Sequence, residues 1–319
     1  TEPQDWFFTF KARYGMREAF SAARETLGDG SAVSQLFTCL TAVTPILGAG
    51  LSPVYADESE ASWSIDPARL ELPADVRALS LQHTFGMVDA ASSARLAALA
   101  HGAGAVVVED CAHCVGRMAR GAGGAPVADV SVHSFGVEKM LDSHFGGAVW
   151  VNPDSPFRGL VGALRRRLAA LPRLSGRLDL LTRMYRTENR VLVHTPRALS
   201  AALRRALSGM GLFEPAVSES ERAGRLQHRP YRPSPSVCSR VLTALDGLDA
   251  SEDRHAAAVG VYRELLADAP GIETLPAAMD GPVQPLLRFP VLARDTRTAD
   301  LVTDEVRAAG FYTTPWYRP

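Results

Sequence analysis

The sequence predicts an α/β protein with a mainly parallel β-sheet that is covered by helices on both faces. Strand-like and helix-like segments alternate along the first half of the chain, which is typical of this class. The strand-like segments are apolar throughout, as in Ala105–Val108, and this indicates strands buried on both sides. The 319 residues are 46% hydrophobic, enough for a large core and, by length, about two domains. We predict a large domain over residues 1–205 and a small C-terminal α/β domain over residues 206–319.

The expected elements of the first half follow from apolar spacing and from the residues that interrupt it. Helical spacing is seen over Tyr14–Leu27, before Gly28, and over Asp89–His101. The expected strands are Ser52–Asp57, Ala78–Leu81, Ala105–Val108, Asp129–His133 and Gly147–Val151. The uncharged stretch Ser31–Ala56 is long enough to cross a membrane. Its prolines and glycines favour a buried helix, a turn and a strand instead.

The second half is predicted to be mainly helical at first and mixed near its end. Helices are expected over Arg158–Leu212, with breaks near Pro172 and Pro196, and again over Ser236–Leu266. Between them, Gln227–Pro235 is rich in proline and arginine and is expected to be a loop. From Gly271 on, short strands are expected to alternate with a helix at Asp300–Ala309. The arginine-rich region Arg158–Arg205 is interpreted as amphipathic helices with a solvated basic face, in preference to a surface for nucleotide diphosphates, an acidic partner or a membrane.

Composition limits the partners and the compartment that we expect. The formal net charge is -1, so nothing in the bulk charge points to nucleic acid as a partner. There are four cysteines, and the N-terminal residues do not have the pattern of a signal peptide. We therefore expect reduced thiols, a cytoplasmic location and no association with a membrane.

Polar residues follow two of the expected strands. Asp110 lies just past the strand Ala105–Val108, Ser134 follows the next strand, and Lys139 comes shortly before the paired Gly146–Gly147. Because ligands bind at the carboxyl ends of parallel strands, these side chains are expected to line one crevice. A lysine that can form a Schiff base, an acid that can hold a pyridine nitrogen protonated and a hydroxyl for phosphate suit pyridoxal 5'-phosphate. The pattern predicts a site for that cofactor.

Two longer motifs carry a resemblance to a known family. GAVVVEDCAHCVG is followed by VSVHSFGVEKMLDSHFGGAVWV, and the pair resembles the E-D-x-A-[QH]-x-x-G and S-F-x-x-x-K motifs of the DegT–DnrJ–StrS family of sugar aminotransferases. The upstream segments GLSPVYADESEASWSIDPARL and QHTFGMVD and the closing segment GFYTTPWYRP are also similar to that family. The resemblance implies the aspartate aminotransferase-like fold of pyridoxal-phosphate transferases, a three-layer α/β/α large domain with a mainly parallel mixed sheet. The small C-terminal domain would be truncated relative to the family.

The resemblance also implies a role for each candidate residue. Lys139 would bind the cofactor and shuttle the proton, and Asp110 would pair with the pyridine nitrogen. The full set of implied cofactor-binding residues is Lys139, Asp110, His113, Ser134, Ala12, Arg13 and Cys39. His113 would lie against the ring or its phenolic oxygen, Ser134 would bind phosphate, and Ala12 and Arg13 would hold phosphate at a helix start. Cys39 falls where many members have an aromatic residue on the cofactor, and Phe145 replaces the usual glutamate before the paired glycines.

The implied function is amino-group transfer from glutamate or glutamine to a keto-sugar or to a cyclitol. We favour a keto-sugar that is linked to a nucleotide. The enzyme would be a homodimer. The alternative is a non-catalytic, cofactor-binding or sensory protein on the same scaffold. A dehydratase relative is disfavoured, because that group has histidine in place of the lysine seen here at Lys139.

Cysteines and histidines near the motif have second interpretations. Cys111 and Cys114 form a C-x-x-C pattern, which by itself suggests redox chemistry or zinc. A second ligand pair is missing from the sequence, so we interpret them as small buried thiols and predict no metal. His83, His133 and His144 are possible acid–base groups, but loop or core positions are the favoured interpretation.

Overall fold

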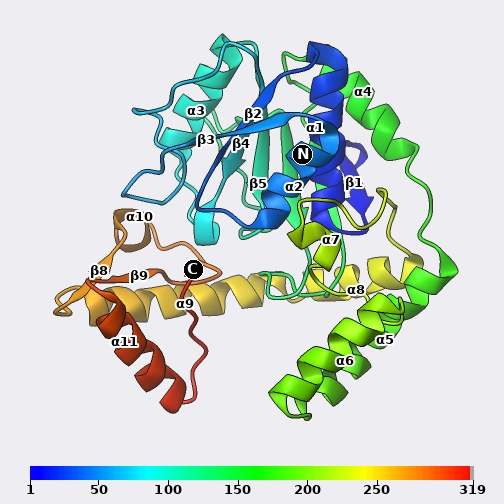
Figure 1. Ribbon diagram of the computed structural model, residues 1–319. Helices are drawn as coiled ribbons and strands as arrows, with labels where there is room; N and C mark the ends of the chain where they lie inside the picture. Colours follow the sequence, from blue (N-terminus) through cyan, green and yellow to red (C-terminus); the bar gives the residue numbers. More distant parts are fainter. Residues whose placement is uncertain (317–319) are drawn as a thin grey trace.

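A mixed β-sheet of seven strands forms the centre of the part of the chain that the structure describes (Figure 1). The structure is a computed structural model that describes residues 1–316, with only the backbone of Arg197; the last three residues of the predicted closing segment lie outside this range. The strands are β1 (Trp6–Thr9), β2 (Ser31–Gln35), β3 (Ser52–Ala56), β4 (Val76–Gln82), β5 (Val106–Cys111), β6 (Val130–Ser134) and β7 (Gly147–Val151). Their order is β1-β7-β6-β5-β4-β2-β3. Strands β2 to β6 are parallel, and β7 runs antiparallel to β6 and to β1. The predicted mainly parallel sheet is confirmed.

Helices cover both faces of this sheet. On one face, α1 (Ala12–Leu27), α2 (Leu40–Ala49) and α4 (Arg158–Ala169) pack on Val106, Val108 and their neighbours. On the other face, α3 (Ala90–Gly102) packs on the alternate strand residues, such as Val107. Alternate residues of each strand therefore enter different cores, which is why the central strands are apolar throughout. The chain has the predicted three layers.

Two strands were not expected from the sequence. Ser31–Ala56 contains β2 before the expected helix, and β1 precedes α1. The five residues of β2 are all buried, but serines and a glutamine interrupt its apolar pattern. In β1, only one of four residues is buried, so the strand lacks the apolar run that marks the others. Tertiary pairing outweighs local pattern in both segments.

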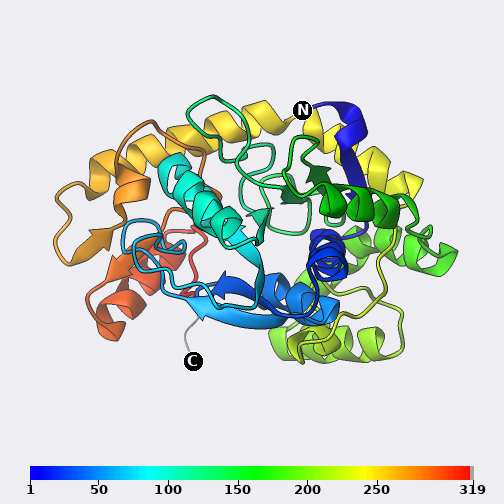
Figure 2. The ribbon, with the colours of Figure 1, turned by 90° about the horizontal axis from the view of Figure 1, so that it is seen from above.

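The second half of the described chain extends below the sheet (Figures 1 and 2). Its elements are α5 (Gly176–Val193), α6 (Arg197–Gly209), α7 (Glu219–Arg222), α8 (Pro235–Leu245), α9 (Leu248–Leu266), β8 (Ile272–Thr274), α10 (Pro276–Met279), β9 (Val291–Ala293) and α11 (Thr296–Ala308); two short 3-10 helices, η1 (Pro3–Asp5) and η2 (Thr84–Gly86), lie earlier in the chain. The expected breaks near Pro172 and Pro196 and the loop after Gln227 are present. In both views α8 and α9 form a long rod that ends near the β8–β9 pair. The predicted domain division at residue 205 falls within α6 and stays a prediction.

Part of the arginine-rich region is engaged with helix α1. Arg167 of α4 pairs with Glu18 at 2.8 Å and with Glu25 at 3.0 Å, and both acids belong to α1. Part of the basic face thus holds α4 against α1, and other arginines of the region, such as Arg186 and Arg190, are exposed, as expected. Among residues 1–316, no helix is long and apolar enough to cross a membrane.

Gly147, the first residue of β7, has no room for a side chain. An added Cβ would lie 2.6 Å from the backbone N and Cα of Ala12, and these backbone atoms cannot rotate away. We expect Gly147→Ala to displace the start of α1 and to lower the free energy of unfolding by about 1–3 kcal/mol. Gly260→Ala is the matched control, because Gly260 lies within α9 and its added Cβ would meet nothing within 4 Å. Chemical denaturation of both variants tests this, and equal stability would contradict it.

Candidate active site

A cavity of about 380 Å³ lies where β4, β5 and β6 end and α1 begins. This is the carboxyl edge of the parallel strands, the usual ligand site of such sheets. Its volume is within the range of small-molecule sites. All seven predicted site residues line it: Ala12, Arg13, Cys39, Asp110, His113, Ser134 and Lys139. The structure therefore brings the predicted set together, and the role of each residue stays a prediction.

Lys139 lies in the loop between β6 and β7. Glu138 and His144 in this loop have φ values of 60° and 71°, and such values in residues other than glycine often occur at functional sites. Lys139 is half-buried and makes no hydrogen bond or ion pair with another described residue. Burial lowers its pKa below the usual range, although the charge of Asp110 opposes this shift. A larger fraction of Lys139 is therefore neutral near pH 7 than of an exposed lysine.

The carboxyl group of Asp110 is buried and has no cation in contact with it. It is 7% exposed, and its Oδ1 accepts a hydrogen bond of 2.9 Å from the amide of Ala112. No ion pair joins it to any residue in the described range. Burial raises the pKa of Asp110, while the Ala112 hydrogen bond and the charge of Lys139 oppose the shift. A cationic group placed against this carboxyl would therefore stabilise its ionised form.

His113 is held as a neutral ring. Its Nδ1 accepts a hydrogen bond of 3.1 Å from the amide of Phe85, so Nε2 carries the proton of the neutral tautomer. Burial, with the charges of Lys139 and Arg288, keeps the pKa of His113 well below its usual value. Its ring stacks on that of Phe85 with an interplanar angle of 9°. An uncharged, oriented imidazole thus forms part of the cavity wall.

Ser134 and the start of α1 supply polar groups to the remaining wall. Ser134 is the last residue of β6, and its Oγ accepts a long hydrogen bond of 3.4 Å from the amide of Gly136. The first amides of a helix have no partner within the helix, and they attract anions. Ala12 and Arg13 begin α1 and line the cavity. The cavity thus combines an anion-binding helix start with a hydroxyl group.

Arg13 has protein partners as well as a place in the cavity. Its Nη1 lies 2.7 Å from Oε2 of Glu221 in α7, and its Nη2 donates to the carbonyl of Ala216 at 2.9 Å. The Glu221 side chain is fully buried and also accepts from the Ser218 amide at 2.8 Å. The sequence suggested a phosphate contact for Arg13 but not this ion pair, because α7 lies more than 200 residues away in the sequence.

We expect Arg13→Ala to destabilise the protein because it leaves the buried Glu221 carboxylate without its cation. Removing one partner of a buried pair costs about 3–5 kcal/mol. The double variant Arg13→Ala/Glu221→Ala should be more stable than the sum of the two single losses predicts. Thermal and denaturant unfolding of the three variants measure this coupling. Additive losses would show that the pair contributes nothing.

Among the charged or polar residues of the cavity that sequence reasoning missed are Lys11, Gln82 and Arg288. Lys11 is buried, and its Nζ lies 2.6 Å from Oε1 of Glu214. Lys11 and Lys139 are the only lysines in the sequence, and both line this cavity. That scarcity of lysine is a signal that could have drawn attention to Lys11. Arg288 pairs with Glu138 at 2.8 Å from a distant part of the chain, and no local pattern marks it.

The remaining predicted features have ordinary structural places. Phe145, which replaces the family's usual glutamate, is buried and stacks on Phe10 with a centroid distance of 5.5 Å. His144 lines the cavity, and its Nδ1 lies 2.7 Å from Asp142. His83 also lines it, and its Nε2 lies 2.8 Å from Glu109. His133 is buried beside Trp6. Cys111 and Cys114 are buried, as predicted.

Comparison with known sequences agrees with the motifs. Residues 22–158 match the model of the DegT/DnrJ/EryC1/StrS aminotransferase family, and the predicted resemblance is confirmed. The chain is 33% identical over 141 residues to L-glutamine:2-deoxy-scyllo-inosose aminotransferase from Streptomyces paromomycinus. This matched stretch covers 43% of this chain and 32% of that protein. It is 28% identical over 138 residues to a pleiotropic regulatory protein of Geobacillus stearothermophilus, 43% of this chain and 36% of that one. The matches span about a third of the length of these relatives.

Solved structures show the same fold over nearly the whole chain. The sugar aminotransferase CalS13 from Micromonospora echinospora matches with a TM-score of 0.66 and 23% identity, over 97% of this chain and 73% of that chain. PseC from Helicobacter pylori, an aminotransferase involved in the biosynthesis of pseudoaminic acid, matches with a TM-score of 0.67 and 14% identity, over 98% of this chain and 72% of that chain. The aspartate aminotransferase-like fold that the resemblance implied is confirmed.

Proposed function

We propose that this chain is a pyridoxal-phosphate-dependent aminotransferase that moves an amino group from glutamate or glutamine to a keto-sugar or a cyclitol. One observation carries the proposal. Lys139 and Asp110 line the same cavity, and neither has an ion-pair partner elsewhere in the described chain. A half-buried amine and a buried carboxyl without partners are costly unless a ligand uses them. The family match over residues 22–158 supports the same conclusion.

The residues of the cavity fit this cofactor. The carboxyl of Asp110, which has no ion-pair partner among the described residues, would hold the protonated ring nitrogen, and Lys139 would hold the cofactor covalently. The start of α1 and the Ser134 hydroxyl would bind its phosphate, and the neutral His113 would lie against its ring. When bound, the cofactor supplies an electron sink that stabilises negative charge on the carbon from which a proton is removed.

Proton movement is the task of Lys139. A lysine whose pKa is lowered by burial has more of the neutral amine near pH 7, so its Nζ can accept a proton and return it at another position. Asp110 remains ionised when a cation lies against it and keeps that cation protonated. The neutral His113 adds no competing charge beside them.

The substrate class is proposed from the names of the relatives. One relative is named for glutamine as donor and 2-deoxy-scyllo-inosose as acceptor. Another relative, 30% identical over 138 residues, is GDP-perosamine synthase from Vibrio cholerae, whose product name contains a nucleotide-linked sugar. These names support a polyhydroxylated ring ketone as acceptor. We favour an acceptor that is linked to a nucleotide. Lys11 and Arg288 in the cavity wall could bind its anionic or hydroxyl groups.

The experiment is an absorbance titration of the cofactor-loaded protein with amino donors added one at a time. We expect the cofactor band to shift with glutamate or glutamine and to return when a keto-sugar or ketocyclitol is added. Aspartate and alanine serve as donor controls. Bound cofactor whose spectrum no amino donor changes would contradict the proposed activity.

A second candidate is a cofactor-binding protein with a regulatory role. The observation that favours it is the similarity to a relative named as a pleiotropic regulatory protein. This function needs Lys139 to hold the cofactor but does not need it to move protons. The absorbance titration distinguishes the two functions, because only the aminotransferase would exchange its amino group.

We also propose a homodimer in the cytoplasm, with the cofactor site at the subunit interface. The family resemblance supports the dimer, and a cofactor-loaded chain should sediment at twice the mass of one chain. Sedimentation velocity across a range of protein concentrations measures this. A stable monomer that retains the cofactor and turns over would contradict the dimer.

A further inference from the structure

A second cluster of reactive side chains adjoins the cofactor cavity: His83 lines the cavity, and Cys111 and Cys114 lie outside its lining. Within a strand, alternate side chains point to opposite faces. Asp110 lines the cofactor cavity, so Cys111, the next residue of β5, points to the other face, where it packs with Cys114, Met118 and Trp150. The proposed cofactor chemistry does not use this cluster.

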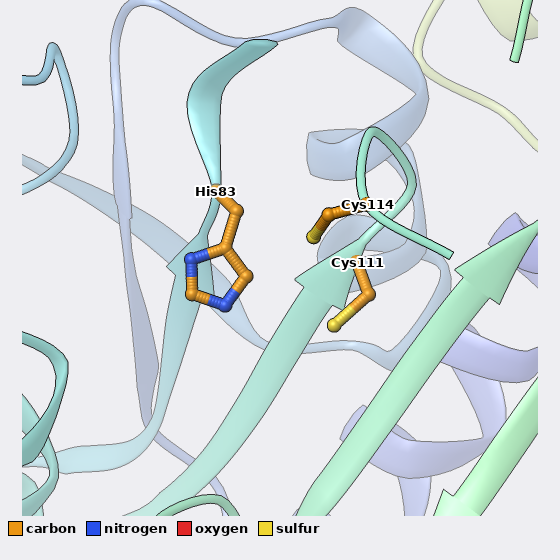
Figure 3. Close-up of side chains that lie close together, drawn as sticks. All are labelled: His83, Cys111 and Cys114. Atoms are coloured by element: carbon orange, nitrogen blue, oxygen red, sulfur yellow. The ribbon is translucent and has the colours of Figure 1, made fainter. Parts of the chain in front are cut away.

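Three ligand-type side chains meet there. One nitrogen of His83 and the sulfurs of Cys111 and Cys114 all lie within 4.8 Å of one another, and all three residues are buried (Figure 3). The two cysteines are joined by a turn in which the Cys114 amide donates to the Cys111 carbonyl at 3.2 Å. His83 comes from a different element, directly after β4. The cluster therefore connects two segments of the fold.

We propose that His83, Cys111 and Cys114 bind a zinc ion. Zinc prefers nitrogen and sulfur ligands in a tetrahedron, and bonds of about 2.3 Å to sulfur place two sulfurs about 3.8 Å apart. The spacing of the three ligand atoms is thus close to that of a bound ion and needs only small rotations to reach it. Soft thiolates also disfavour magnesium and calcium, which take oxygen ligands.

The surrounding charges suit a cation. Oε1 of Glu109 lies 2.8 Å from Nε2 of His83, and it also accepts from the Ala119 amide at 2.6 Å. In Figure 3 Nε2 is the His83 nitrogen on the side of the cysteines, so a bound ion would replace Glu109 as the partner of that nitrogen, and the carboxylate would remain beside the ion. His133 is the register partner of Cys111 on β6, and its buried Nε2 has no hydrogen-bond partner among the described residues. The cluster thus has a buried carboxylate and a second buried imidazole beside it.

Binding is balanced in charge and in protons. Each thiol loses its proton to solvent as its sulfur bonds to the ion, so Zn²⁺ and two thiolates add no net charge to the core. Because His83, Cys111 and Cys114 are all buried, the ion would enter while the chain folds. It would fasten the Cys111–Cys114 turn, which carries His113 and directly follows Asp110, to the end of β4. The site does not depend on the proposed aminotransferase activity.

The test is metal analysis of the full chain purified after expression with zinc and again after refolding with cobalt. We expect one zinc ion per chain, and with cobalt the near-ultraviolet thiolate charge-transfer band and intense visible bands of a tetrahedral site. Cys111→Ser and Cys114→Ser should each abolish stoichiometric zinc. Cys238→Ser is the matched control, since this cysteine lies outside the cluster, and it should retain the ion.

A readout on the unaltered chain keeps the test decisive if a serine variant fails to fold. Zinc should protect Cys111 and Cys114, but not the exposed Cys39, from alkylation during partial unfolding, as mapped by mass spectrometry. Reduced protein that takes up neither metal would overturn the proposal, as would metal that Cys238→Ser loses and Cys111→Ser keeps. Recovery of a Cys111–Cys114 disulfide with no metal would also overturn it and would indicate a redox pair.

Discussion

Lys139→Ala should abolish amino transfer and the covalent attachment of the cofactor. Lys139 is the half-buried amine of the cavity, and no described residue forms an ion pair with it. Among the described residues, no other amine without an ion-pair partner lines the cavity to attach the cofactor and transfer the proton in its place. The loss of proton transfer alone is expected to reduce kcat by about 10²–10⁴-fold. Steady-state kinetics with the cofactor in excess measure the loss, and the absorbance of the purified variant reports attachment.

The sequence provides its own control for this prediction. Lys11 is the only other lysine and lines the same cavity, but it is ion-paired with Glu214 at 2.6 Å. Reduction of the loaded protein with borohydride should fix the cofactor to Lys139 and leave Lys11 unlabelled. Peptide mapping by mass spectrometry reads this directly. Label on Lys11, or full activity in Lys139→Ala, would show that Lys139 is not the residue that carries out the chemistry.

Asp110→Asn should keep part of the cofactor binding but lose most of the activity. The carboxyl of Asp110 is buried, and only a charged group can hold a ring nitrogen protonated by electrostatic attraction. An amide of nearly the same shape cannot. Removing one oriented electrostatic group from an active site costs on the order of 10²–10³-fold in kcat. We therefore expect a large fall in kcat with a much smaller change in cofactor affinity.

The matched control for Asp110→Asn is Asp142→Asn, because Asp142 lies in the Lys139 loop and contacts His144 but does not line the cavity. This variant should keep kcat within a few-fold of the unaltered protein. Measurement of kcat, KM and cofactor affinity separates the two roles. Equal kcat in the two variants would show that the charge of Asp110 has no special part in the reaction.

The strands and their carboxyl-end residues could be predicted because their signals are local. An apolar run such as Val106–Val108 is buried on both faces, and the polar pair that follows it, Glu109–Asp110, must lie near the strand end. The same logic placed Ser134. Parallel order then brings these ends together, so the residues of the cavity followed from patterns a few residues long.

Contacts between distant segments could not be predicted in the same way. Arg13 meets Glu221 in α7, and Arg288 meets Glu138, across about 150 to 200 residues of sequence. Neither glutamate nor arginine is unusual in its local sequence, so only the folded chain shows these pairs. The short strand β1 was missed for a related reason, since its place depends on pairing with β7.

The C-x-x-C motif shows the limit of spacing as a guide. Two cysteines three positions apart predict a pair of thiols in one turn, and without a second pair the sequence favoured inert thiols. His83 precedes Cys111 by 28 residues and reaches it only because β4 and β5 are neighbours. A third ligand from an adjacent strand cannot be recognised from the spacing of the motif itself.

The most direct test of the central proposal is a single-turnover measurement on cofactor-loaded protein without an acceptor. With an excess of glutamate or glutamine, we predict one equivalent of the corresponding oxo acid per loaded chain, quantified by mass spectrometry, and none from Lys139→Ala. Release of that single equivalent without acceptor, and continued release once a keto-sugar or ketocyclitol is added, is the result that an aminotransferase requires. Loaded protein that forms no oxo acid from any amino donor would contradict the account.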